Sequence, residues 1–296
     1  LSLGKEFLTR TWKLYQIVKR EKPDVLLGCM GPSVSVVGKL TGIPTYVFYD
    51  NESALLVNSF VQRIATKYIT SSSYEKKVPR NHMTYSGYQN LAYLHPTYFQ
   101  PDKKVLNKAN ISPTEPFFIV RLVSFESSHD LGVTGLSDRL GLCQRLERYG
   151  KVIITSEKPL PFEFDKYRLS LPPENLHHLL AFATMCIGES ATLAAEAALL
   201  GVPAIYVASS FRGYTNELER EYGLVYNFKE QQEAEKKIFE LLPQKNIKKE
   251  WQKKHEKLLS DKIDVTEWMV RLVEERVKDF IEKSSAPSTN PTRWSS

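Results

Sequence analysis

The stretch Ile187-Gly-Glu-Ser-Ala-Thr-Leu-Ala-Ala-Glu-Ala-Ala-Leu-Leu-Gly-Val-Pro-Ala-Ile-Tyr-Val207 decides the fold. It reads as a strand, a tight turn, an alanine-rich helix, a glycine stop and a second strand. Within residues 191–200 the only charged residue is Glu196, and nearly every face of this helix is apolar. We therefore expect the helix to be buried against a sheet.

The same helix predicts a site for a ligand that carries both negative charge and hydroxyl groups. A helix that begins at Ser190 directs unbonded backbone N–H groups forward, which suits a phosphate. Thr192 and Glu196 are four residues apart and share a face, so Glu196 would lie one turn deeper. There, a ribose diol could donate two hydrogen bonds to its carboxylate. A buried carboxylate without hydrogen-bond donors would be energetically costly. The pattern indicates a nucleotide or a nucleotide-sugar; the alternative is a glutamate at the solvent edge of the helix.

The rest of the chain alternates strands and helices, which predicts an α/β fold with doubly wound parallel sheets. Strands are expected over residues 25–28, 46–49, 67–70, 117–123, 151–155, 168–171, 185–188, 204–208 and 224–228. Helices are expected over residues 5–21, 31–39, 54–66, 136–149, 174–183, 191–200, 214–222 and 230–242.

A stretch rich in proline and aromatic residues, 87–116, interrupts this rhythm and predicts a domain boundary. We assign residues 1–105 to an N-terminal Rossmann-like domain, which looks truncated because the chain starts at Leu1 without Met. Residues 106–283 form the nucleotide-sugar-binding domain with charged C-terminal helices, and the Ser/Pro/Thr-rich tail 284–296 is expected to be disordered. The charged helices over 229–283 are interpreted as solvated helices packed by one edge, with a basic membrane-surface helix as the alternative.

Composition narrows the class of protein. The chain has 296 residues and a net charge of +6, which favours anionic ligands or a mildly basic solvated surface. No apolar run approaches the roughly 20 residues that cross a bilayer, and no signal peptide is recognisable. The three separated cysteines, Cys29, Cys143 and Cys186, are interpreted as reduced core residues of a cytoplasmic protein, with peripheral membrane contact as the alternative location.

Several motifs are absent. The sequence has no Asp-x-Asp pair, phosphate-binding Walker loop, G-x-G-x-x-G fingerprint, G-x-S-x-G elbow or Cys/His zinc spacing. We therefore expect neither a metal nor a cofactor. Nucleic-acid-binding modules are not recognisable either, so no nucleic-acid partner is expected.

Polar residues cluster after the predicted strands, where ligands bind in open parallel sheets. His129 could hold a phosphate or shuttle protons, although a lone loop histidine can also be incidental. Arg212 could clamp a phosphate or a sugar. The candidate site residues are Gly31, Ser33, Asp50, Glu52, Ser124, His129, Glu189, Ser190, Thr192, Glu196, Arg212, Asn216 and Glu217.

Residues 188–207 resemble the donor-nucleotide segment of GT-B glycosyltransferases, especially the MurG-type N-acetylglucosaminyltransferases, and are similar to the matching segment of UDP-N-acetylglucosamine 2-epimerases. Lys22-Pro-Asp-Val-Leu-Leu-Gly28, Gly31-Pro-Ser33 and Gly42-Ile-Pro-Thr-Tyr-Val47 resemble the MurG-type N-terminal domain. A closer resemblance is to the domain of unknown function 354 family. It rests on Tyr85-Ser-Gly-Tyr-Gln-Asn-Leu-Ala-Tyr-Leu-His-Pro96, Arg121-Leu-Val-Ser124, His129-Asp-Leu-Gly132, Lys151-Val-Ile-Ile-Thr-Ser-Glu157 and Arg212-Gly-Tyr-Thr-Asn-Glu217.

The resemblance implies a GT-B-like fold and roles for the site residues. Ser190 and Thr192 would face the donor diphosphate and Glu196 the ribose. Asn216 and Glu217 would lie near the donor sugar or phosphate, and Ser124 and His129 in the cleft.

It implies a metal-independent sugar transferase that uses a UDP-sugar and an unidentified acceptor in polysaccharide or glycolipid synthesis. Two alternatives stay open. One is an epimerase in which Asp50, Glu52 and His129 carry out proton chemistry at the sugar. The other is a non-catalytic protein that binds a nucleotide-sugar.

Overall fold

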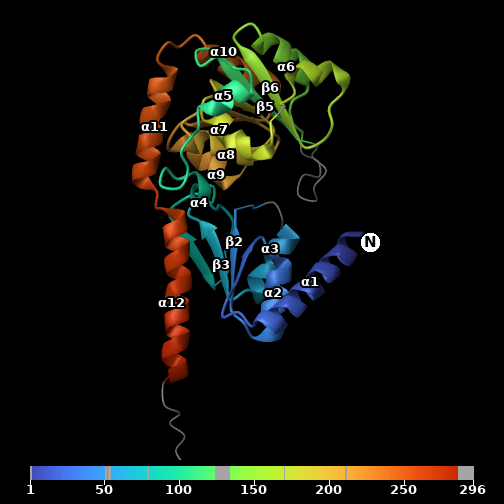
Figure 1. The fold of residues 1–296 in the computed structure, drawn as a ribbon, viewed down its shortest axis with the longest axis vertical. Coiled ribbons are helices and arrows are strands. Elements are labelled where there is room, and N and C mark those ends of the chain that lie inside the picture. Colours follow the sequence, from blue (N-terminus) through green and yellow to red (C-terminus); the bar gives the residue numbers. More distant parts are fainter. Residues whose placement is uncertain are drawn as a thin grey trace, which may run out of the picture.

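The computed structural model describes residues 2–50, 52, 55–78, 80–123, 134–169, 171–210 and 212–285. Two parallel β-sheets, each flanked by helices, form two lobes (Figure 1). The predicted α/β fold with parallel sheets is confirmed.

The first lobe contains a four-stranded parallel sheet in the order β1-β2-β3-β4. Its elements are α1 (Ser2–Glu21), β1 (Leu26–Cys29), α2 (Pro32–Thr41), β2 (Thr45–Tyr49), α3 (Leu55–Ile64), β3 (Lys67–Ser71) and β4 (His82–Tyr85). All five residues of β2 are buried, as expected for a central strand that helices cover on both faces.

The second lobe contains a five-stranded parallel sheet in the order β6-β5-β7-β8-β9. Its strands are β5 (Phe117–Leu122), β6 (Lys151–Ser156), β7 (Met185–Gly188), β8 (Ala204–Val207) and β9 (Val225–Phe228). Its helices are α6 (Arg139–Leu146), α7 (Leu176–Leu180), α8 (Ala191–Leu199), α9 (Gly213–Arg220), α10 (Gln231–Leu241) and α11 (Ile247–Asp261), with 3-10 turns η1 (Phe162–Tyr167) and η2 (Pro173–Asn175).

Two features differ from the sequence prediction. The strand expected over residues 168–171 is not formed by the described residues of this stretch, which pair with β6 through one isolated bridge, Arg168 to Ile154, and the hydrogen bond from the Leu169 N–H to the Ile154 carbonyl. The following residues, Pro172 and Pro173, have no N–H group with which to extend a ladder. The edge strand β4 was not predicted, because its four residues show no clear apolar alternation.

Cys143 and Cys186 are buried free thiols, whereas Cys29 is exposed at the end of β1 and is not a core residue.

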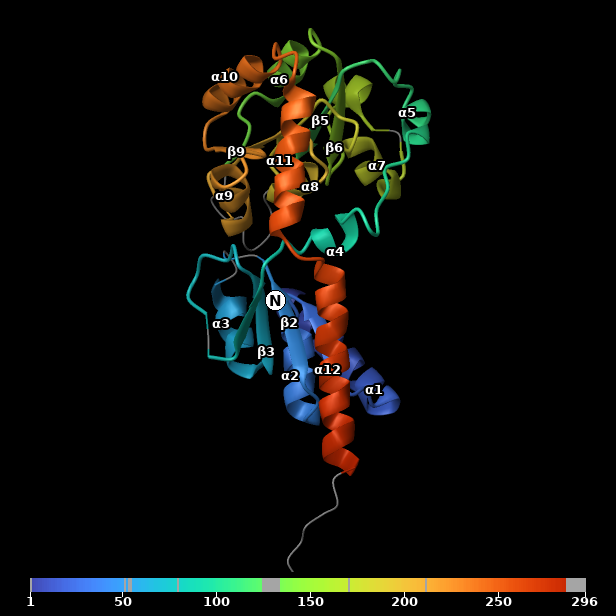
Figure 2. The same cartoon turned by 90° about the vertical axis from the view of Figure 1, so that its left-hand side faces the viewer.

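A connection with two short helices, α4 (Leu91–Leu94) and α5 (Lys104–Lys108), joins the lobes, and the chain finally returns to the first lobe through α12 (Val265–Ser285). Figures 1 and 2 show α11 beside the second lobe and α12 beside the first. Trp268 of α12 packs on Tyr85 with ring centroids 5.2 Å apart, and the Ile263 N–H donates to the Ser86 carbonyl at 2.9 Å. Thus α12, which we had assigned with the second domain, packs on β4 and α4.

The carboxyl ends of the two sheets face each other. Asp50 and Glu52 follow β2, while Arg212 and Gly213 follow β8. The Gly213 N–H donates to the Glu52 carboxylate at 3.1 Å. A side chain on Gly213 would lie 2.1 Å from the Ser73 carbonyl oxygen, so this approach of the lobes requires glycine.

No helix in the described ranges is both long enough and apolar enough to cross a membrane.

Candidate functional site

The turn that begins α8 depends on one glycine. Gly188 has φ +151°, and a Cβ atom there would lie 2.2 Å from the Arg121 carbonyl oxygen. Glycine alone fits this turn without strain. Ser190 then caps the helix, and its hydroxyl accepts a hydrogen bond from the Leu193 N–H at 3.2 Å. Thr192 is exposed in the first turn.

Glu196 lies inside the protein rather than at a solvent edge, with 7% of its surface exposed. Its Oε1 atom accepts a hydrogen bond from the Tyr93 hydroxyl at 2.6 Å and a longer one from Asn90 Nδ2 at 3.5 Å. The Nε2 atom of His177 lies 3.2 Å from the same oxygen. Two hydrogen-bond donors and the imidazole ring of His177 therefore surround one buried carboxylate, and the hydrogen bonds offset the cost of burying it.

The side chains that contact Glu196 come from two different parts of the chain. Asn90 and Tyr93 belong to the connection after β4, and His177 lies in α7 of the second lobe. Asn90 Nδ2 also donates to the Tyr93 hydroxyl at 2.7 Å. Burial, followed by the nearby Glu196 charge, raises the pKa of Tyr93, so its hydroxyl keeps its proton and donates to Glu196.

A second group of charged residues lies at the ends of β2 and β8. Glu52 and Arg212 are buried, at 6% and 7% exposure, and Asp50 is partly buried. Burial raises the pKa of both the Asp50 and the Glu52 carboxyl groups, more than the nearby Arg212 lowers them. Two carboxyl groups that favour protonation beside a guanidinium are suited to proton transfer or to binding a hydroxyl-rich ligand.

Two buried acceptor atoms near these charged residues, Glu52 Oε2 and Gln89 Oε1, have no hydrogen-bond partner among the described residues. Both residues line a small cavity between the lobes, together with Asp50, Asn90 and Tyr214. Because unmet buried acceptors are costly, this cavity favours a group that donates hydrogen bonds, such as a hydroxyl or a water molecule.

A larger cavity, of about 280 Å³, opens at the carboxyl ends of β5 and β6. Its walls combine the apolar side chains Leu169, Leu171 and Leu176 with polar and basic ones, among them Arg121, Thr155, Ser156, Lys158 and Arg168. Leu176 directly precedes His177, which contacts Glu196. A cavity with both apolar and basic walls therefore reaches the residue next to this contact.

Two other predicted carboxylates have partners within the protein. Glu189 binds Arg139 at 2.9 Å and accepts hydrogen bonds from the Val123 and Leu136 N–H groups, both at 2.8 Å. It thereby joins the chain on either side of residues 124–133. Glu217 accepts a hydrogen bond from the Tyr88 hydroxyl at 2.7 Å and forms an ion pair with Lys262, which links α9 to the connection between the lobes and to the end of α11.

The remaining predicted residues are spread over several places. Asn216 donates to Glu75 across the lobes at 3.1 Å. Gly31 precedes α2, and the buried Ser33 accepts a hydrogen bond from Thr11 of α1 at 2.9 Å. Ser124 and His129 lie outside the described residues.

Asn90, Tyr93 and His177 were not singled out by the sequence analysis. The first two lie in an aperiodic connection, 106 and 103 residues from Glu196. The available signal was Glu196 itself, because a buried carboxylate requires donors without showing where they come from.

No group of three or more His, Cys, Asp or Glu side chains in the described part of the chain is arranged to hold a metal ion.

Comparison with known proteins gives a fold. No protein-family model matches the sequence, and no curated protein matches it. The structure is similar to the UDP-GlcNAc 2-epimerase from Neisseria meningitidis bound to UDP-GlcNAc, with a TM-score of 0.66 and 12% identity, covering 94% of this chain and 82% of that one. For the UDP-N-acetylglucosamine 2-epimerase from Rickettsia bellii the TM-score is 0.62 and the sequence identity 17%, and the match covers 95% of this chain and 81% of that one. For MurG from Acinetobacter baumannii the TM-score is 0.52 and the sequence identity 16%, and the match covers 92% of this chain and 79% of that one. The chain therefore has a GT-B-like fold, whereas membership of the domain of unknown function 354 family stays a prediction.

Glu52 should lower the stability of the protein at neutral pH. Its carboxyl pKa is raised in the folded state, mainly by burial, so folding favours the protonated form. The associated stability is fully present below the ordinary pKa of about 4.5 and is lost as the pH rises through the folded value. Replacing Glu52 with Gln removes this loss while keeping an acceptor for the Gly213 N–H.

We therefore expect Glu52→Gln to melt at a higher temperature than the unmodified protein near pH 7, with the difference shrinking toward pH 4. Thermal unfolding across this range measures it. The exposed Glu163→Gln is the control and should show no such trend. A Glu52→Gln protein that is less stable at neutral pH would contradict the assignment.

Proposed function

We propose that this protein is a GT-B-type enzyme that transfers a sugar from a nucleotide-sugar donor, with a UDP-sugar as the donor class. The observation that carries the proposal is the buried Glu196 carboxylate, which accepts hydrogen bonds from Tyr93 and Asn90 and lies 3.2 Å from the His177 ring, at the boundary between the lobes. The two hydroxyl groups of a ribose would supply the same kind of donors to this carboxylate.

A bound nucleotide would extend from Glu196 in two directions. The diphosphate would lie at the start of α8, near Ser190 and the exposed Thr192, where backbone N–H groups and the helix dipole favour an anion. The base would occupy the cavity beside Leu176, the residue next to His177, where Leu169 and Leu171 offer apolar surface. The sugar would then point toward Asp50, Glu52 and Arg212.

The structural neighbours support this class of ligand. Several of them were solved in complex with UDP, UDP-GlcNAc or thymidine diphosphate. Stabilisation of the leaving diphosphate by a helix start would need no metal, in line with the absence of an Asp-x-Asp pair from the sequence.

A second candidate function is epimerisation of the nucleotide-sugar. It is favoured by Asp50 and Glu52, because burial raises the pKa of both carboxyl groups toward the range in which a side chain can both give and take a proton. Both lie where the sugar would lie in the proposed pose.

The ribose role of Glu196 predicts a loss of UDP affinity in Glu196→Gln. A charged acceptor contributes more to a hydrogen bond than a neutral amide, so we expect a loss of about tenfold, or about 1.4 kcal/mol. Isothermal titration calorimetry with UDP measures it. Glu163→Gln, an exposed carboxylate in the 3-10 turn η1, is the matched control. Unchanged UDP affinity in a folded Glu196→Gln protein would exclude the ribose role.

Tyr93 should compete with the nucleotide, because its hydroxyl already occupies Glu196 at 2.6 Å. Tyr93→Phe removes this hydrogen bond, and we expect UDP to bind about fivefold more tightly, as one net hydrogen bond allows. Tyr98→Phe is the control, since Tyr98 also donates to a carboxylate, that of Asp264 at 2.9 Å, but lies outside the site. Weaker UDP binding by Tyr93→Phe would show that Tyr93 assists the nucleotide instead.

Incubation with UDP-N-acetylglucosamine and no acceptor separates the two candidate reactions. A sugar transferase should leave the nucleotide-sugar unchanged until an acceptor is added. Formation of the C2 epimer, followed by proton NMR, would show epimerisation. At a nucleotide-sugar concentration well below saturation, the Glu196→Gln protein, purified in the same way, should show about a tenfold lower rate of whichever activity is found, and an unchanged rate would indicate a contaminating enzyme.

A further inference from the structure

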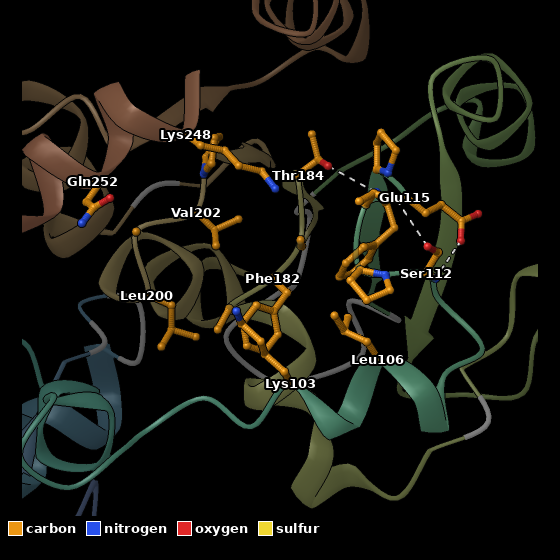
Figure 3. Close-up of a pocket in the computed structure, with 18 of the residues that line it drawn as sticks. Lys103, Leu106, Ser112, Glu115, Phe182, Thr184, Leu200, Val202, Lys248 and Gln252 are labelled. Carbon is orange, nitrogen blue, oxygen red and sulfur yellow. Dashed lines mark hydrogen bonds between the residues drawn. The ribbon is translucent and has the colours of Figure 1, made fainter. Parts of the chain in front are cut away.

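A large cavity lies on the side of the second sheet opposite the candidate site. It has a volume of about 670 Å³ and is formed at the amino ends of β5, β7 and β8. Five segments line it: the connection around α5, residues 112–117, the turn after α7, the turn after α8, and one face of α11. Figure 3 shows these walls around an open centre.

The floor of this cavity is apolar. Leu106, Phe117 and Val202 are buried beneath it, and Phe182 and Leu200 are partly exposed toward it. A volume of this size with a mainly apolar lining falls in the range of sites that hold small organic molecules.

Two lysine side chains lie on opposite walls of the cavity, Lys103 from the start of α5 and Lys248 from α11 (Figure 3). Both are exposed, and neither has an ion pair or hydrogen bond from its ammonium group to any residue that the structure describes.

The carbonyl groups at the end of α8 do not need these ammonium groups. The Ala197 and Ala198 carbonyls accept hydrogen bonds from the Val202 and Gly201 N–H groups, at 2.9 and 3.0 Å. The Leu199 carbonyl lies 2.7 Å from His255 Nε2. Because the helix end is satisfied internally, the positive charge of the two lysines remains available to a ligand.

Glu115, the acidic residue in the cavity wall, already accepts a hydrogen bond from its own segment. The Glu115 carboxylate accepts a hydrogen bond from the Ser112 N–H at 3.2 Å, which closes a turn of its own segment. Burial lowers the pKa of His255, so this wall residue is neutral near pH 7 and adds no charge. Two ammonium groups and one carboxylate leave the rim of the cavity positive.

We propose that this cavity binds a small organic anion, a molecule with a carboxylate or phosphate head group and a hydrocarbon body. The head group would lie between the ammonium groups of Lys103 and Lys248, and the hydrocarbon body would lie on Leu106, Phe182 and Leu200. The site does not depend on the proposed nucleotide site, because it lies at the opposite edge of the sheet.

Calorimetric titration with octyl phosphate and with octanoate tests the proposal, and inorganic phosphate tests whether the hydrocarbon body is needed. We expect saturable binding of octyl phosphate or octanoate at one site, and much weaker binding of inorganic phosphate. The stronger of the two amphiphiles identifies the head group. Absence of saturable binding by both, or equal binding of inorganic phosphate, would overturn the proposal.

The position of the site is tested by the double variant Lys103→Gln, Lys248→Gln. We expect at least about a fivefold loss of affinity for the bound amphiphile, as for the loss of two exposed ion pairs. The double variant Lys245→Gln, Lys249→Gln removes the same charge outside the cavity and should bind normally. Equal affinity in both double variants, or displacement of the amphiphile by saturating UDP, would place the ligand elsewhere and overturn the assignment.

Discussion

A carboxylate inside an apolar helix has to be met by donors, and in this protein that requirement joins the two lobes. Glu196 projects from α8, whose other residues are almost all buried against the second sheet. The side chains that contact its carboxylate come from α7 and from the connection that leads out of the first lobe. The position of α4 and the position of Glu196 therefore depend on each other. A ligand with vicinal hydroxyl groups would replace part of this network rather than fill an unused site.

A second buried carboxylate, that of Glu52, also joins the two lobes. Gly213 has no side chain, so its N–H reaches Glu52, and Glu217 and Asn216 continue the contact along α9. The buried Glu52 and its raised pKa make this contact costly at neutral pH. Residues that lower stability in this way are common at functional sites, where a group is kept in a state suited to chemistry.

Much of the fold could be predicted from the sequence, because buried parallel strands and their helices have strong periodicity. The segment from β7 to β8 was predicted with nearly correct bounds, since glycine, serine and proline mark its turns. The strand expected over residues 168–171 failed where prolines limit pairing, and β4 was missed where the pattern is weak. For the site, the burial of Glu196 followed from its apolar neighbours. Tyr93 and Asn90 could not be predicted, because a contact across about a hundred residues depends on how the two lobes meet.

A crystal structure of the protein with UDP tests the central claim most directly. Our account predicts that the two ribose hydroxyl groups donate to Glu196 and that the Tyr93 hydroxyl has moved away from it. UDP bound elsewhere, with the hydrogen bond between Tyr93 and Glu196 intact, would contradict it.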